Sequence, residues 1–208
     1  MSYLLYGERG SGSCIVEAAL AEIGAPFTIR DLDLGSDEQR GAEYAAINPQ
    51  RKLPALLTQS GETLTESVAI LLTLMDRHPD HALLPADPKQ RAQALRWLVF
   101  VAAELYPIIE INDYPERFTP EQACTEGVRQ QAKEIWRERW LIVENNISGD
   151  PWLLASGFCV TDIYIAVVSR WAQQTDWRPQ HIPRIEALTA AVKSRPAVAP
   201  VWKRHFGS

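Results

Sequence analysis

The first part of the chain alternates short apolar runs with a longer stretch of helical periodicity. Residues 3–6 form a short β-prone run. Apolar side chains then recur at helical spacing over residues 13–23, with Ser13 expected as the N-cap and Gly24 as the helix end. Residues 27–32 have the pattern of a second strand. A strand, a helix and a strand in so short a span predict a parallel βαβ unit.

A proline marks the next group of apolar positions. Pro54 stands directly before the apolar run 55–57. Because proline has no N–H to give to a sheet, it belongs at a strand start or an edge. Residues 60–61 (Ser-Gly) predict a turn, and residues 62–64 predict the returning strand of a hairpin. The next helix is expected to open at residues 65–67.

These elements together define a first domain. A short helix between the second strand and the hairpin is predicted by residues 36–39 (Ser-Asp-Glu-Gln), which fit a capping box. The resulting order, βαβ–α–ββ–α, is that of a thioredoxin-like α/β fold. We therefore expect a thioredoxin-like domain over residues 1–79, followed by a proline-containing linker over residues 80–88.

Beyond the linker the pattern is helical and predicts an all-α domain over residues 89–208. Pro107 is expected to kink or end the first of its helices. Residues 119–122 (Thr-Pro-Glu-Gln) combine an N-cap, a proline at the first helical position and Gln at the third, which is a strong helix start. Two of the expected helices cover residues 89–111 and 160–171. Three others are expected to begin at residues 119, 183 and 195.

Composition and charge narrow the function. The chain of 208 residues has a net charge of −5, so nucleic acid is not a favoured partner. No secretory signal and no apolar stretch long enough to span a bilayer are found, so no membrane partner is expected. The three cysteines (Cys14, Cys124 and Cys159) form no CxxC pair, and the four histidines have no metal-ligand spacing. We expect a cytoplasmic protein with no disulfide framework and no metal.

The stretch from residue 48 to residue 70 offers three features that suit a small zwitterionic peptide. The chain beside Pro54 is expected to present a backbone edge. The helix start near Ser67 has free N–H groups, and the helix dipole favours an anion there. Glu66, an acid, can hold an ammonium group of the same ligand.

Lys52-Leu53-Pro54-Ala55 followed by Thr65-Glu66-Ser67 resembles the glutathione-binding half of the glutathione S-transferase family. The resemblance implies that Pro54 is cis and that Leu53 exchanges backbone hydrogen bonds with the cysteinyl part of glutathione. It also implies that Glu66 and Ser67 bind the γ-glutamyl end, and Lys52 could pair with the glycyl carboxylate. A small α/β domain followed by a helical domain matches the whole architecture of that family, so the resemblance covers essentially the full chain.

In that family a Tyr, Ser or Cys near the end of the first strand stabilises the thiolate of bound glutathione, which is the nucleophile. Here the usual catalytic serine of several classes falls on Gly10, and the catalytic cysteine of the bacterial beta class falls on Gly12. We expect Ser11 to be the donor, through a shift of one residue in the loop. Ser13 comes next, although it could equally be the helix N-cap. Tyr6 aligns with a beta-class tyrosine near the sulfur, and its alternative role is a strand residue packed against the core.

The resemblance also places part of the site in the helical domain. The beta class reaches glutathione from the helix after the linker with an Asn, a Glu, a His and a Lys. Of these Glu104 is kept, and we expect it to reach the site of a partner subunit in a homodimer. Tyr106 is expected to wall the electrophile pocket, although it could equally be a residue of the core or of the dimer interface. The family's buried Asp at the start of the core helix is matched by Asp162, for which we expect a structural role. Cys159 stands where the capping hydroxyl should be, and Thr161 is the substitute we consider.

The resemblance implies a glutathione S-transferase that uses glutathione as a cosubstrate against small electrophiles or peroxides. Gly10 and Gly12 at the customary catalytic positions keep open a second interpretation, a binding or regulatory module without catalysis. Cys14 keeps open a third, glutathione-dependent thiol–disulfide exchange, because a thiolate is favoured in the first turn of a helix. Its alternative role is that of a small buried core residue.

Overall fold

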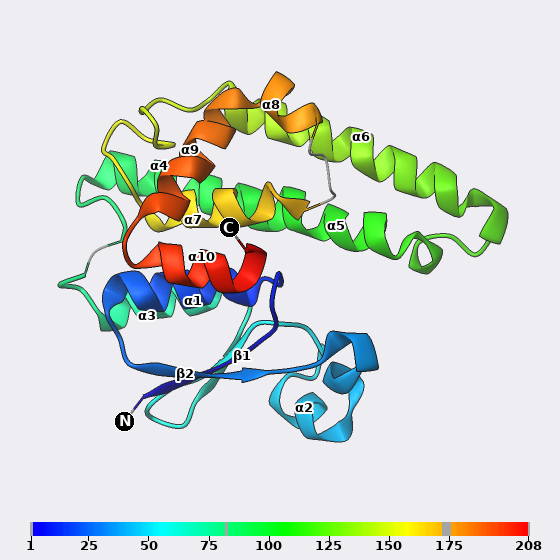
Figure 1. Ribbon diagram of the computed structural model, residues 1–208, viewed down its shortest axis with the longest axis horizontal. Coiled ribbons are helices and arrows are strands. Elements are labelled where there is room, and N and C mark those ends of the chain that lie inside the picture. The colour runs from blue at the N-terminus through cyan, green and yellow to red at the C-terminus, as the bar shows by residue number, and fades with distance from the viewer. Residues whose placement is uncertain (1, 82, 172–175, 208) are drawn as a thin grey trace. The chain divides into compact units, whose positions relative to one another are not determined.

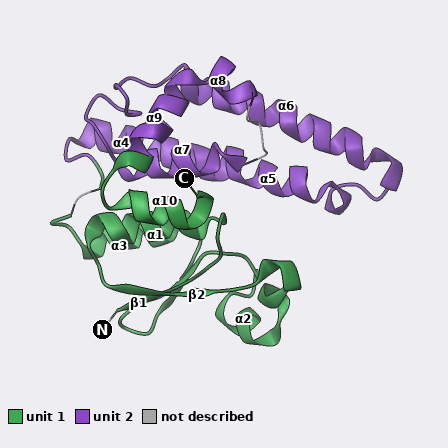
Figure 2. Cartoon of the chain, in the orientation of Figure 1, with its two compact units in different colours: residues 1–84, 193–208 green, residues 85–192 purple. Residues whose placement is uncertain are grey.

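The computed structural model describes residues 2–81, 83–171 and 176–207, which form two compact units (Figures 1 and 2). Unit 1 contains residues 1–84 and 193–208, and unit 2 contains residues 85–192. The predicted fold class is confirmed: a thioredoxin-like α/β sheet with its helices is followed by a helical part. Within the described ranges, no helix is both long enough and apolar enough to cross a membrane.

Unit 1 is built on a mixed sheet whose four strands have the order β2-β1-β3-β4. Strand β1 pairs in parallel with β2, and β3 pairs antiparallel with both β1 and β4. The predicted βαβ unit and hairpin are therefore both present. The strands are β1 (Tyr3–Gly7), β2 (Phe27–Asp31), β3 (Ala55–Leu57) and β4 (Thr63–Thr65).

Helices α1 (Ser13–Ile23), α3 (Ser67–Arg77) and α10 (Val198–Phe206) lie together on one side of the sheet (Figure 1). Leu5 of β1 is fully buried in the core of this unit. Helix α1 packs against both α3 and α10, and nine of its eleven residues are buried. This cover explains its nearly continuous apolar sequence and makes the buried acid Glu17 an exception.

The other side of the sheet is covered by the short helix α2 (Ala42–Ile47) (Figure 1). Since successive strand residues face opposite sides, Tyr6 of β1 points away from the side of Leu5. Its ring lies 5.8 Å from that of Tyr44, centroid to centroid. The small cluster on this side consists of Leu32, Tyr44 and Ala55, with Tyr6, Ile47 and Leu53 packed against it.

The first helix does not begin as predicted. Gly12 is the N-cap of α1, and Ser13 is the first helical residue. The hydroxyl of Ser13 lies 3.2 Å from both the N–H and the carbonyl oxygen of Glu8. It is therefore engaged with the loop before the helix, which is why it does not cap the helix itself.

The capping box predicted at residues 36–39 is also wrong. Two 3₁₀ turns occupy this region, Leu34–Ser36 and Glu38–Arg40, and α2 begins after them. Asp37 between the two turns has φ +58°, a left-handed conformation that interrupts a helix. Asp33 caps the first turn by accepting the N–H of Gly35 and of Ser36 through Oδ1, at 2.9 and 3.2 Å.

Unit 2 begins with a long helical segment that contains one irregular stretch. Helix α4 (Pro88–Phe100) passes into a π-helical segment, Val101–Leu105, and then into α5 (Tyr106–Asp113). Pro107 lies in the first turn of α5, where its missing N–H needs no partner. The hydrogen-bond pattern changes in the π-helical segment before the proline. The chain therefore stays helical where we expected a kink or an end.

One of the other helices of unit 2 starts later than predicted. Helix α6 (Thr125–Glu144) begins after a 3₁₀ turn at Gln122–Cys124. Thr119 does not cap it, because its Oγ1 accepts the N–H of Glu121 at 3.2 Å. The buried core helix α7 (Val160–Val168) is confirmed, and so is the start of α9 (Pro183–Ser194) at its proline, whereas the short helix α8 (Trp177–His181) was missed.

The last helix does not belong to the helical unit. We expected residues 89–208 to form one domain, but residues 193–208 group with unit 1, where α10 packs on α1. The reason is that α1 is apolar on the side turned away from the sheet and needs a cover there. Helix α10 buries Val198, Val201, Trp202 and His205, and the sequence does not say which partner they cover.

Asp162 at the start of α7 has the expected structural place. Its Oδ1 accepts the N–H of Leu153 at 2.8 Å, and its Oδ2 accepts the N–H of Cys159 at 2.7 Å. Thr161 does not replace the capping hydroxyl, since its Oγ1 donates to the carbonyl of Ala94 at 3.0 Å. Burial and the nearby Asp162 charge raise the pKa of the Cys159 thiol to about 12, so this thiol stays protonated.

Candidate functional site

The main chain before Pro54 is held in place from α2. The carbonyl of Lys52 accepts hydrogen bonds from the Tyr44 hydroxyl (2.8 Å) and from the side-chain amide of Asn48 (2.7 Å). The Leu53–Pro54 peptide bond is cis, as the resemblance implied. Burial raises the pKa of Tyr44 to about 12, so its hydroxyl remains a donor at neutral pH. The backbone at this edge is thus fixed by two side chains of the neighbouring segment.

The hairpin register brings the two halves of the motif together. Ala55 of β3 pairs with Thr65 of β4, Leu56 with Leu64, and so on along an antiparallel ladder. Continuing this register by one residue sets Pro54 beside Glu66. The cis-proline edge and the start of α3 therefore adjoin each other in unit 1, although eleven residues of chain lie between Pro54 and Glu66.

The start of α3 has an unusual backbone. Glu66 is the N-cap, with φ +62° and ψ 109°, and its side chain does not cap the helix. A residue other than glycine in such a conformation costs about 1–3 kcal/mol and is found most often at functional sites. Glu66 is exposed, whereas Ser67, the first helical residue, is 7% exposed. The first N–H groups of α3 lie here, where a helix dipole favours an anion.

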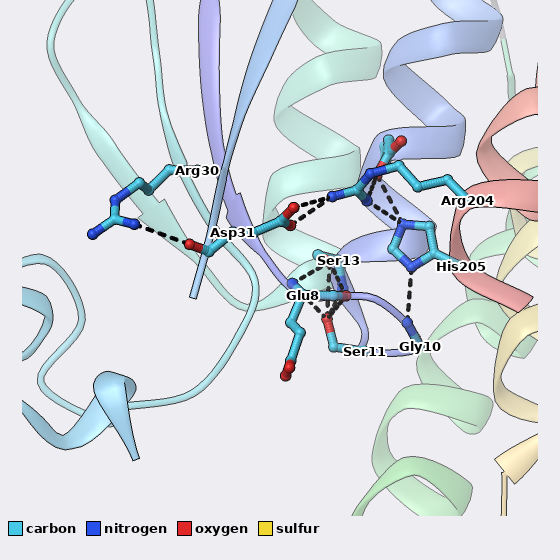
Figure 3. A network of polar contacts seen from close by, with 9 residues as sticks. Glu8, Gly10, Ser11, Ser13, Arg30, Asp31, Arg204 and His205 are labelled. Atoms are coloured by element: carbon cyan, nitrogen blue, oxygen red, sulfur yellow. Dashed lines mark hydrogen bonds and ion pairs between the residues drawn. The ribbon is translucent and has the colours of Figure 1, made fainter. Parts of the chain in front are cut away.

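The loop between β1 and α1 contains a compact set of hydroxyl contacts (Figure 3). Ser11 Oγ lies 2.8 Å from the Glu8 carbonyl oxygen and 2.8 Å from Ser13 Oγ. Ser13 Oγ lies 3.2 Å from the same carbonyl oxygen. The Glu8 N–H approaches both hydroxyl oxygens, at 3.3 Å for Ser11 and 3.2 Å for Ser13. Two of our candidate donors are therefore neighbours in one network.

The two serines differ in how deeply their hydroxyl groups are buried. Two hydroxyl protons serve three oxygen–oxygen contacts, so if Ser13 donates to the Glu8 carbonyl, the proton of Ser11 can go to another acceptor. Ser13 is 1% exposed, and a methyl group on Gly7 would overlap its hydroxyl. Ser11 is half-buried. Of the two, Ser11 is the hydroxyl with room to turn toward a ligand.

Tyr6 and Cys14 lie in different surroundings from the serines. Tyr6 pairs with Ala55 across the sheet and packs on Tyr44, so its described contacts are those of a strand residue on the α2 side. Cys14 is the second residue of α1 and is 1% exposed. Its burial fits the expected alternative of a small core residue.

Two candidates belong to unit 2. Glu104 lies in the π-helical segment and forms an ion pair with Arg139 of α6, Oε2 to Nε 2.8 Å. Tyr106 packs against Trp171, with ring centroids 4.7 Å apart, and against Tyr164, at 6.4 Å. The roles of both in glutathione and electrophile binding stay predictions. The same holds for Lys52, whose side chain is exposed beside the cis-proline edge of unit 1.

One polar network near the loop was missed by sequence reasoning. His205 and Arg204 of α10 meet Glu17 of α1, and the His205 ring also reaches the backbone of Gly10 (Figure 3). The sequence did contain one signal, because an acid in the middle of an apolar helix must find a partner if it is buried. It could not tell that this partner lies 188 residues away.

A cis-proline edge beside a helix start, on a thioredoxin-like sheet, is the arrangement that the resemblance to the glutathione S-transferase family implied. Residues 1–74 match the family described as glutathione S-transferase, N-terminal domain. Glutathione S-transferase GstA of Escherichia coli O157:H7 is 30% identical over 93% of this chain and 94% of its own length. The uncharacterized GST-like protein YncG of Escherichia coli K12 is 28% identical over 97% of both.

A solved structure supports the same assignment. The crystal structure of a glutathione transferase homologue from Sulfitobacter, with bound glutathione, superposes with a TM-score of 0.90. It is 27% identical and covers 96% of each chain. The chain described here belongs to the glutathione S-transferase family.

Proposed function

We propose that this protein binds glutathione beside Pro54 and uses its thiolate against small electrophiles or peroxides. The observation that carries the proposal is the register of the hairpin, which sets the cis-proline edge beside the strained start of α3. The family relationship and the glutathione in the Sulfitobacter homologue support it.

Each part of glutathione has a chemical counterpart in unit 1. The backbone of Leu53 would exchange hydrogen bonds with the cysteinyl residue. Glu66 would hold the ammonium group of the γ-glutamyl end, and Ser67 with the first N–H groups of α3 would hold its carboxylate. Lys52 would pair with the glycyl carboxylate. Two anions and one cation of the ligand are thereby each matched by a group of the opposite sign or by N–H donors.

The thiol of glutathione must be ionised to attack. A free thiol has a pKa of about 8.5, so it is mostly protonated at neutral pH, and a hydroxyl donor aimed at the sulfur stabilises the thiolate. Ser11 is our first choice for this donor, because Ser13 can keep the Glu8 carbonyl satisfied while Ser11 turns. Ser13 and Tyr6 are the alternatives.

Replacing Ser11 with alanine should raise the pKa of the bound thiol by at least about one unit, toward the free value of about 8.5. The thiolate is the charged form, so removing its donor disfavours ionisation and shifts the titration to higher pH. The measurement is a pH titration of thiolate ultraviolet absorbance in the complex, with Ser13→Ala and Tyr6→Phe as matched comparisons. A shift that survives in Ser11→Ala but vanishes in one of the others would transfer the role to that residue.

The wild-type titration tests the function itself. A bound thiol with an unshifted pKa would contradict glutathione activation and favour a binding or regulatory module. Gly10 and Gly12 at the customary catalytic positions motivate that second candidate. Turnover with any standard electrophile or peroxide would argue against it. Failure to bind glutathione at all would overturn both.

Replacing Cys14 with alanine should leave turnover within about twofold of wild type, since only a thiolate with access to its target acts as a nucleophile and this thiol is 1% exposed. Alanine is preferred to serine because a buried hydroxyl would need a new partner. The assay is glutathione-dependent turnover with both an electrophile and a disulfide. A selective loss of disulfide reduction would favour thiol–disulfide exchange as the activity.

Assembly and location are parts of the same proposal. We propose a homodimer in which Glu104 reaches the glutathione of the partner subunit. A location in the cytoplasm is proposed because Cys14, Cys124 and Cys159 form no disulfide with one another.

A further inference from the structure

Two buried side chains far apart in sequence meet beside the loop that carries Ser11. The side chains of Glu17 on α1 and His205 on α10 are 5% and 0% exposed. Glu17 Oε2 lies 2.8 Å from His205 Nε2 and 2.7 Å from Arg204 Nη1. On its other ring nitrogen, His205 Nδ1 accepts the backbone N–H of Gly10 at 3.1 Å (Figure 3).

These contacts fix the tautomer of the His205 ring. The Gly10 N–H is an obligate donor, so Nδ1 must be the unprotonated nitrogen. A neutral ring then carries its proton on Nε2 and donates it to Glu17. Arg204 Nη1, 2.9 Å from Nε2, therefore shares the Glu17 oxygen with the ring rather than donating to the ring nitrogen. The Gly10 N–H and the Glu17 carboxylate therefore select the same tautomer.

Arg204 anchors this carboxylate from the other side. Its Nη2 binds both carboxylate oxygens of Asp31 at the end of β2, at 2.5 and 2.7 Å. Burial alone would lower the pKa of Arg204, but the hydrogen bond to Asp31 and the charges of Glu17 and Asp31 raise it above its ordinary value. The arginine thus remains a cation between two acids, which keeps Glu17 in place as the acceptor for His205.

The group held by His205 lies next to the proposed thiolate donor. Gly10 has φ +75° and directly precedes Ser11 in the loop. The bond to His205 fixes the planar peptide unit between residues 9 and 10, and this unit ends at the Cα atom of the residue before Ser11. The loop is therefore tied to α10 at the residue before Ser11.

We propose that His205 is a positioning residue for glutathione activation: as a neutral acceptor it holds the Gly10 N–H and so sets the direction of the Ser11 hydroxyl. The inference rests on the proposed function. It assigns to a residue of α10 the task of holding the loop that carries Ser11. Glu17 acts through His205 by fixing its tautomer. His205 itself touches no reacting atom.

Two substitutions of His205 separate its two hydrogen bonds. In His205→Asn the side-chain oxygen takes the place of Nδ1 and can accept from Gly10, but the contact with Glu17 is lost. In His205→Gln the amide reaches the place of Nε2 and can donate to Glu17, but the acceptor for Gly10 is lost. Both variants remove one hydrogen bond and some ring packing, so each serves as the stability control of the other.

We expect His205→Asn to keep kcat within about twofold, and His205→Gln to lower kcat about five- to tenfold with KM for the electrophile unchanged, since a misdirected donor affects the thiolate and not electrophile binding. The pKa of bound glutathione should rise in His205→Gln alone. Equal losses in both variants, at equal urea midpoints, would show a merely structural role. Wild-type behaviour of His205→Gln would also overturn the proposal.

A measurement without glutathione separates this inference from the proposed function. Amide hydrogen exchange at Gly10 in the free protein should be at least tenfold faster in His205→Gln than in His205→Asn. Unchanged exchange would refute the link even if glutathione is activated, whereas faster exchange together with an unshifted wild-type thiol pKa would refute the proposed function alone. If either variant fails to fold, NMR of the ring nitrogens of His205 in the wild-type protein provides the test. A protonated Nδ1 would overturn the proposal, because it could not accept the Gly10 N–H.

Discussion

Replacing Ser67 with alanine is expected to weaken glutathione binding by about ten- to a hundredfold, because hydrogen bonds to charged groups contribute about 1.5–3 kcal/mol. Ser67 is nearly buried at the start of α3, so the carboxylate it would bind has little water to replace the lost hydroxyl. The fold should survive, since alanine is well tolerated at the first position of a helix. Calorimetric titration of the protein with glutathione measures the effect directly.

Two further variants sharpen this experiment. Glu66→Ala should weaken binding less than Ser67→Ala, because Glu66 is exposed and its ion pair with an ammonium group would be screened by water. Ser60→Ala is the matched control: Ser60 is an exposed serine in the turn of the same hairpin, and its hydroxyl bonds to Glu62. The Ser60→Ala variant should bind glutathione with the affinity of the wild type. Retained affinity in both site variants would mean that glutathione does not bind at the start of α3.

Replacing Asp162 with alanine is expected to lower the free energy of unfolding by about 2–5 kcal/mol, since each buried donor left without a partner costs about 1–3 kcal/mol. The two donors are the N–H groups of Leu153 and Cys159, and Asp162 is 0% exposed. Urea denaturation measures the change, and exchange of the two amides shows whether they are released.

The chemistry of the carboxylate can be tested with a closer substitution. Asp162→Asn keeps one oxygen but turns an NH₂ group toward the second donor, so it should recover only part of the lost stability. Asp113→Ala, at an exposed acid that ends α5 in the same unit, should change the stability by no more than about 0.5 kcal/mol. If Asp162→Ala behaved like Asp113→Ala, the two amides would have to find other acceptors at the start of α7.

The local parts of the fold and site could be predicted because their causes are local. Pro54 must stand at a strand start, Ser60 and Gly61 must turn, and the apolar spacing after Ser67 must form a helix with its N–H groups free. The thioredoxin-like class followed from these elements in order. The register of the hairpin does not follow from them, because a two-residue turn at 60–61 would set Pro54 opposite Ser67. The observed loop covers residues 59–61, and this shift by one residue sets Pro54 beside Glu66 instead.

Helix starts were harder to predict from the sequence, because a side chain that could cap a helix has other possible hydrogen-bond partners. Ser13 is a good N-cap by residue type, but its hydroxyl is used by Glu8, and Gly12 takes the position. Thr119 likewise binds the N–H of Glu121 two residues on. Local hydrogen bonds of serine and threonine compete with capping, and the sequence alone does not decide between them.

The network around His205 was beyond prediction for a different reason. Its members come from three elements, α1, β2 and α10, and the contact between Glu17 and His205 closes a loop of 188 residues. No periodicity along the chain records such a contact. The sequence predicted a last helix, but the partner of α10 depends on which apolar surface remains open after the sheet and α3 have packed.

The placement of α10 has a consequence for synthesis of the protein. Chains emerge from the ribosome N-terminus first, and domains generally fold as units. A nascent chain that has reached residue 192 contains all four strands, α1 and α3, yet it still lacks the segment 193–208 that completes unit 1. Until that segment emerges, Glu17 lacks its partners Arg204 and His205. Unit 1 therefore begins to emerge before unit 2 and is completed after it.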